Sequence, residues 1–125
     1  VTGVQTCALP ILLMAQIETE RGLEALDAIA ATDGIDVLWL GHFDLSNFMG
    51  IAGQFDHPAF NKAFEQVANA AARHGKAAGF MASSTSWVSR ARRAGYRMLA
   101  AGTDTAILQA GFAHLIDSMR APQGD

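Results

Sequence analysis

Short apolar runs of strand length alternate with longer helical stretches four times along this chain, and this alternation limits the fold more than any other feature. Several stretches carry helix boundary residues: Thr19 can cap the first helix and Gly34 can end it, while Pro58 suits a first helical turn. We predict strands at residues 12–17, 35–40, 76–81 and 96–101. We predict helices between residues 19 and 34, 58 and 75, 83 and 95, and from 104 to 119, with a polar loop at 41–57.

Repeated strand–helix units build a parallel sheet with helices outside it. Two α/β architectures fit four such units: a doubly wound domain, and the C-terminal half of a (β/α)8 TIM barrel, whose full length is typically about 250 residues. Residues 1–11 resemble the in-frame translation of a sequencing-library adapter. Such a segment would mark a truncation of the natural protein, which favours the half barrel. We therefore expect an artefact at 1–11, the half barrel at 12–120, and a frayed tail at 121–125.

Composition restricts the class of partner. Half of the residues are apolar, 17% are charged and the net charge is −3, which is typical of a globular protein. A nucleic-acid partner is not expected, because phosphate binding needs a basic surface. No apolar run approaches the roughly 20 residues that span a bilayer. The single cysteine, Cys7, lies in the expected artefact. We expect a soluble cytoplasmic protein with no membrane or nucleic-acid partner.

Two carboxylates follow neighbouring predicted strands, at the edge where parallel α/β proteins place function. Glu18 follows the first strand and Asp44 the second, so a sequential strand order brings them together. Gln16 shares the face of Glu18, because side chains alternate along a strand. Two oxygen ligands with room for water and substrate suit Mg²⁺ or Mn²⁺. Structural roles remain open: Glu18 as a partner of a helix dipole, and Asp44 as a loop residue bonding its own backbone.

Four segments together resemble the HpcH/HpaI aldolase family: QIET, GHFDLSNFMGIAGQFDHP, HGKAAGF and AAGTDTAIL. The pairing of Q-I-E with G-x-x-D-L-S at this spacing carries most of the specificity, and the resemblance covers nearly all of residues 12–115. It implies a (β/α)8 barrel and a metal-dependent class II aldolase. Such an enzyme reversibly cleaves a 4-hydroxy-2-oxo acid to pyruvate, or a close 2-oxo acid, and an aldehyde.

The resemblance also implies roles for the residues at the strand ends. Glu18 and Asp44 match the two metal-ligand positions, for Mg²⁺, Mn²⁺ or Co²⁺ acting as a Lewis acid. Gln16 matches a glutamine beside the metal, and we class it as catalytic and substrate-binding. The loop of the second strand matches the segment that holds the pyruvate carboxylate, with substrate contacts from Gly41, Phe43 and Asp44.

Further implications concern the third strand and the assembly. Met81 matches an apolar position that contacts the substrate. The partners implied are small molecules and further copies of the chain, in homo-oligomers built from dimers that exchange the last helix, residues 104–119. The family's histidine base and its arginine belong to the N-terminal half. We therefore expect this chain alone to be inactive. We also expect it to associate, because half a barrel has two unprotected sheet edges and exposed apolar inner faces.

The sequence departs from the family at His42, where many relatives have proline. This histidine is close to the predicted metal, so we count it with Gln16 as a candidate catalytic residue. We expect His57, before Pro58, to order the loop. We expect a solvated outer surface or subunit contact from the basic cluster Arg90, Arg92, Arg93 and Arg97. The alternatives are a citrate-lyase-like acyl-CoA lyase of the same superfamily and a non-catalytic flavodoxin-like binding domain.

Overall fold

The computed structural model describes residues 11–120, within which four parallel strands form one sheet. These are β1 (Met14–Ile17), β2 (Val37–Leu40), β3 (Ala77–Met81) and β4 (Met98–Ala100), and they lie in the sheet in chain order. A doubly wound sheet would reverse its strand order at a switch point. The described part of the chain shows no such reversal. The flavodoxin-like alternative is therefore wrong, and the α/β half barrel is confirmed.

The helices that follow the strands begin close to where the sequence predicts. The stretch after β1 forms two short helices, α1 (Glu20–Glu24) and α2 (Leu26–Ala31), and Thr19 caps α1 by accepting from the Gly22 amide. Helix α4 (Pro58–Arg73) starts at the expected proline, and Ser84 caps α5 (Thr85–Arg93). The expected artefact at 1–11, apart from Ile11, and the tail at 121–125 lie outside the described residues.

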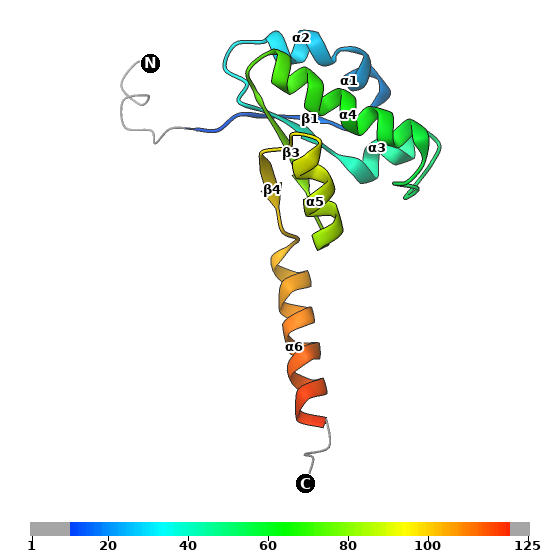
Figure 1. Cartoon of the computed structure of the whole chain (residues 1–125), viewed down its shortest axis with the longest axis vertical. Coiled ribbons are helices and arrows are strands. Elements are labelled where there is room, and N and C mark those ends of the chain that lie inside the picture. The colour runs from blue at the N-terminus through cyan, green and yellow to red at the C-terminus, as the bar shows by residue number, and fades with distance from the viewer. Residues whose placement is uncertain (1–10, 121–125) are drawn as a thin grey trace, which may run out of the picture.

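Side chains alternate between the two faces of the sheet, and α4 covers one of them (Figure 1). The buried side chains of the covered face are Ile17, Leu38, Leu40, Ala78 and Phe80, which form one core with Phe60, Phe64 and Val67 of α4. The opposite face would line the interior of a complete barrel. A hollow of about 370 Å³ there is lined by Met14, Gln16, Trp39, Met98, Leu99 and Ala100.

The predicted polar loop at 41–57 is wrong in its first half, because helix α3 (His42–Phe48) begins directly after β2. Leu45 is fully buried in the core, and its amide donates to the Gly41 carbonyl. The buried Ser46 hydroxyl donates to the Phe43 carbonyl and accepts from the Gly53 amide. The helix therefore depends on tertiary packing and on a side-chain clasp, which local patterns in the polar segment 41–57, with its three glycines, do not reveal.

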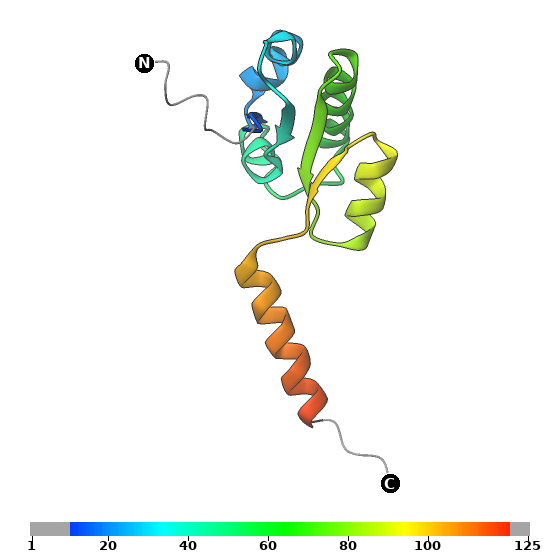
Figure 2. The same cartoon turned by 90° about the vertical axis from the view of Figure 1, so that its left-hand side faces the viewer.

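Helix α6 (Asp104–Arg120) projects away from the sheet and its covering helices, as Figure 2 shows. Its N-terminus is capped by Thr103, whose hydroxyl accepts from the Ala106 amide. Its exposed apolar side chains are Ile107, Leu108, Phe112, Leu115, Ile116 and Met119. Within residues 11–120, no helix combines the length and hydropathy needed to cross a bilayer.

Candidate functional site

Gln16 and Glu18 lie together at the carboxyl end of β1. The Nε2 amide of Gln16 donates to Oε2 of Glu18 over 2.5 Å. Ile17, between them, points to the other face and is only 1% exposed, so burial of its side chain fixes the direction of its two neighbours. The prediction that Gln16 and Glu18 lie on the same face of the strand is therefore confirmed.

Gly41 lies against this pair at the carboxyl end of β2, where its amide donates to the Ile17 carbonyl over 2.9 Å. A Cβ atom on Gly41 would lie 2.8 Å from Cβ of Glu18, 3.0 Å from Nε2 of Gln16 and 3.2 Å from Oε2 of Glu18. Real Cβ atoms essentially never make a contact as short as the first of these. The Glu18 side chain thus lies so close to residue 41 that only glycine fits there without a shift.

Asp44 lies in the first turn of α3, three residues after Gly41, and is exposed. The first amides of a helix have no partner inside the helix, and those of Phe43 and Asp44 belong to this turn. The amide of Leu45 is the first that bonds back, to Gly41. This sheet edge therefore carries two carboxylates and a set of outward amide donors.

The donor set at this edge suits a hard divalent cation. Carboxylate oxygens are the ligands that Mg²⁺ and Mn²⁺ prefer, and these ions keep several positions for water or substrate. Within residues 11–120, no three histidine, cysteine or acidic side chains lie close enough to hold a metal by themselves. The two carboxylates predicted as ligands follow neighbouring strands: Glu18 comes directly after β1, and Asp44 lies in the helix after β2. The space that Gly41 leaves for the Glu18 carboxylate fits this assignment.

His42 takes a different position from the other candidates, because its side chain is only 8% exposed. Its ring centroid lies 4.4 Å from that of Phe43, 5.2 Å from Phe55 and 5.0 Å from Phe80, which belongs to the covered face. Burial lowers the pKa of His42, and the nearby charge of Asp44 opposes part of that shift. The structure groups Gln16, Glu18 and Gly41, and it packs the His42 ring into an aromatic cluster.

The remaining candidates lie around this edge. Met81 ends β3, is partly buried and alternates with Phe80, which belongs to the face covered by α4. The Phe43 ring is 57% exposed and meets the Phe55 ring edge-on at 5.2 Å. His57 caps α4, because its Nδ1 accepts from the Ala59 amide over 3.2 Å. His57 thus orders the loop as the sequence suggested.

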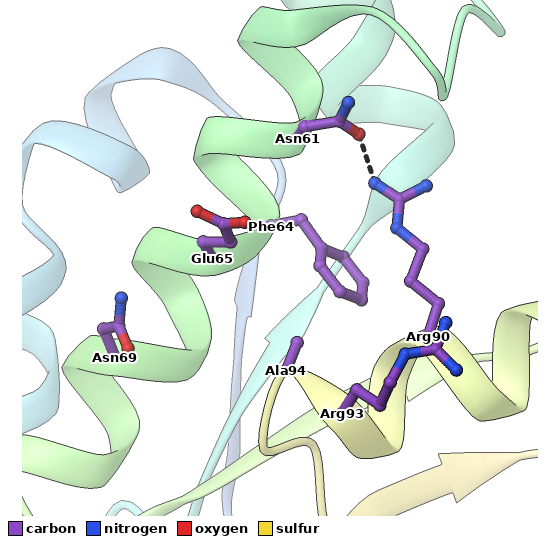
Figure 3. Close-up of a pocket in the computed structure, with 7 residues that line it drawn as sticks. All are labelled: Asn61, Phe64, Glu65, Asn69, Arg90, Arg93 and Ala94. Carbon is purple, nitrogen blue, oxygen red and sulfur yellow. Dashed lines mark hydrogen bonds between the residues drawn. The ribbon is translucent and has the colours of Figure 1, made fainter.

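Sequence reasoning missed the part played by Arg90. Arg92, Arg93 and Arg97 are exposed as expected, whereas Arg90 is partly buried between α4 and α5. Figure 3 shows Arg90 reaching Asn61 of α4 across a groove of about 530 Å³, which is lined by Asn61, Phe64, Glu65, Asn69, Arg90, Arg93 and Ala94. The sequence signal that could have revealed it is Trp87, one turn earlier on the same helix face.

Comparison with known proteins adds to this geometry. A family model described as HpcH/HpaI aldolase/citrate lyase matches residues 2–110. A 5-keto-4-deoxy-D-glucarate aldolase of Escherichia coli O6:H1 is 34% identical over 110 residues, which are 88% of this chain and 43% of that protein. A crystal structure of an HpcH/HpaI aldolase from Desulfitobacterium hafniense DCB-2 matches with a TM-score of 0.79 and 36% identity, over 91% of this chain and 44% of the other.

A second solved structure supports the same match. A HpcH/HpaI aldolase/citrate lyase family protein from Burkholderia cenocepacia J2315 superposes with a TM-score of 0.83 at 31% identity, over 89% of this chain and 43% of the other. The chain therefore spans less than half the length of each of these three relatives. This share agrees with four strand–helix units of an eight-unit barrel.

Proposed function

This chain belongs to the HpcH/HpaI aldolase/citrate lyase family, and on that premise we propose that it provides the C-terminal half of a divalent-metal-dependent aldolase site. The proposed reaction is reversible cleavage of a 4-hydroxy-2-oxo acid to pyruvate, or a close 2-oxo acid, and an aldehyde, in the cytoplasm. One observation carries the proposal: the Glu18 carboxylate is held by Gln16 in a space left open by Gly41, one helical turn before Asp44.

In this proposal Glu18 and Asp44 hold a Mg²⁺, Mn²⁺ or Co²⁺ ion, which when bound supplies Lewis-acid stabilisation of the enolate. Gln16 donates to Oε2 of Glu18 and so limits the orientation of the carboxylate that would bind the ion. Partners of this kind orient metal ligands in many sites and raise metal affinity. Gln16 also remains our candidate for contact with the substrate.

The remaining candidates take binding roles. The outward amides of Phe43 and Asp44, after Gly41, can donate to the carboxylate of a 2-oxo acid, because amides at a helix start favour anions. Met81 provides an apolar wall at the end of β3. His42 stays a candidate for the reaction, but its aromatic surroundings favour a role in supporting α3.

We also propose that the whole protein is a homo-oligomer in which α6 is exchanged between subunits, as the family resemblance suggests. The apolar side chains of α6 support this, because residues such as Phe112 and Leu115 are 57% and 54% exposed. A projecting helix with this many apolar side chains in water would be costly, and a neighbouring copy would cover them.

The test is an aldol-cleavage assay on a complete barrel, made by joining the N-terminal half of the Escherichia coli relative to residue 12 of this chain. With Mn²⁺, we expect pyruvate release from a 4-hydroxy-2-oxo acid, followed with lactate dehydrogenase, and loss of this release in Asp44→Ala. An acyl-CoA lyase would instead need a CoA thioester. Activity retained in Asp44→Ala, or activity confined to the thioester, would contradict the proposal.

A further inference from the structure

We propose that Arg90, on α5, is a positioning residue for the metal-site edge of the sheet, acting through the loop between α3 and α4. This inference rests on the proposed function, because the edge it positions is the one that carries Glu18 and Asp44. Arg90 lies behind this edge, on the covered side of the sheet, and its effect has to pass through other side chains.

The guanidinium of Arg90 is held on several sides at once. Its Cζ lies 4.4 Å from the Trp87 ring and 5.0 Å from the Phe64 ring, which is within the range of cation–π contact. One Nη donates to the Asn61 side chain. The other donates to the Phe55 carbonyl over 3.5 Å and lies 3.8 Å from the Asp56 carboxylate. Arg90 therefore joins α5 and α4 to the loop residues just before α4.

Phe55 connects Arg90 to α3, because its carbonyl accepts from Arg90 and its ring packs against the start of the helix. Its ring centroid lies 5.2 Å from His42 and 5.2 Å from Phe43, the first two residues of the helix that carries Asp44. The same loop is tied to α3 at its other end, where the Gly53 amide donates to the Ser46 hydroxyl over 3.0 Å. Because α3 is short, these contacts, and not helix propensity, fix where its first turn lies.

The experiment measures Mn²⁺ affinity of this chain by electron paramagnetic resonance of the free ion. We expect Arg90→Met to weaken binding about tenfold, the lower end of the effect of removing a group that orients metal ligands. The change in charge alone would raise the Mn²⁺ affinity, because losing a positive charge favours a bound cation. Arg93→Met is the matched control on the same helix: it removes an exposed charge and should leave the affinity unchanged or slightly higher.

Hydrogen exchange supplies a readout that global destabilisation would not reproduce. Arg90→Met should speed exchange of the Gly53 and Leu45 amides and leave that of Leu38, in the central strand β2, unchanged. Should Arg90→Met fail to fold, Phe55→Leu is the second test, because it keeps Arg90 and removes the ring that contacts α3, as well as Phe60 and Trp87. We expect the same loss of affinity. Unchanged Mn²⁺ affinity in a folded variant overturns this inference alone. A native chain that does not bind Mn²⁺ overturns the proposed function, and this inference with it.

Discussion

The amide of Gln16 donates to the carboxylate of Glu18 across a single buried residue, Ile17, so that both side chains lie on one face at the carboxyl end of β1. Neither residue is in the core, and the contact exists because strand side chains alternate. The carboxylate is thereby limited in its orientation before any cation arrives. This contact is the observation that supports a ligand role for Glu18 in the proposed site.

Removing the donor of Gln16 should therefore weaken metal binding without removing a ligand. Gln16→Met keeps the length of the side chain, and we expect about a tenfold loss of Mn²⁺ affinity. Isothermal titration checks this. Met14→Leu, on the same face of β1 but one pleat further from the edge, is the control and should bind as the native chain does. Equal affinity in both variants would mean that the Gln16 contact has no part in the site.

Gly41→Ala tests the space that the carboxylate occupies. The new Cβ would meet Cβ of Glu18 at 2.8 Å, so the backbone or Glu18 must move. We expect a loss of about 1–3 kcal/mol in unfolding free energy, together with weaker Mn²⁺ binding. Urea unfolding provides the measurement. The control is Gly111→Ala in α6, where nothing lies within 4 Å, and which should be neutral or stabilising. A Gly41→Ala chain as stable and as tight-binding as the native one would contradict the packing described.

Tyr96→Phe tests the core beneath the site. The Tyr96 hydroxyl donates to the buried Phe64 carbonyl over 2.9 Å, and the two rings stack at 4.4 Å. We expect a loss of about 1 kcal/mol, because this carbonyl, which also accepts a bond within α4, loses its second donor while the ring contact is kept. The same urea series gives the value. No change in midpoint would show that the hydroxyl finds an equal partner in water.

Tyr96 also predicts a dependence on alkaline pH. Burial raises the pKa of Tyr96 far above its usual range. The folded chain therefore keeps the proton above pH 10, where the unfolded chain releases it, and stability falls as the pH rises past about 10. In Tyr96→Phe, folding stability should fall less steeply above pH 10, because the tyrosine that contributes to the fall is absent. Since the chain has one tyrosine, tyrosinate absorbance follows its ionisation directly. Titration of the folded protein near pH 10 would contradict the burial.

The exposed face of α6 predicts self-association of this chain. Phe112→Glu should shift the protein toward smaller species in sedimentation velocity, because it places a charge among apolar side chains that a partner would cover. His114→Glu is the control, since positions two apart on a helix do not share a face. If both variants sediment like the native chain, the assembly does not use this face of α6.

The sequence predicted the elements whose boundaries are set locally. Pro58 starts α4 and Gly75, with a φ of +69°, follows its end, so that helix could be placed to within a residue or two. The Gln16 and Glu18 arrangement followed from strand alternation alone. Helix α3 could not be predicted, because it depends on the burial of Leu45 and on the clasp between Ser46 and Gly53.

The positions of His42 and Arg90 could not be read from the chain for the same reason. Proximity in sequence put His42 beside the predicted metal, but the aromatic rings of Phe55 and Phe80, both distant along the chain, hold its ring in the core. The four arginines look alike in sequence, and only the packing of α5 on α4 makes one of them different. Local sequence patterns carry no information on these contacts between residues that are distant along the chain.

The central claim is that Glu18 and Asp44 together hold one divalent cation. The direct test is Mn²⁺ titration of this chain beside Glu18→Gln and Asp44→Asn, with Asp33→Asn as a control at an exposed carboxylate elsewhere. We predict one site in the native chain and in Asp33→Asn, and a loss of about 100-fold or more in each ligand variant, since each removes a charged oxygen ligand. Binding that survives either ligand substitution, or a native chain that binds no Mn²⁺, would contradict the claim.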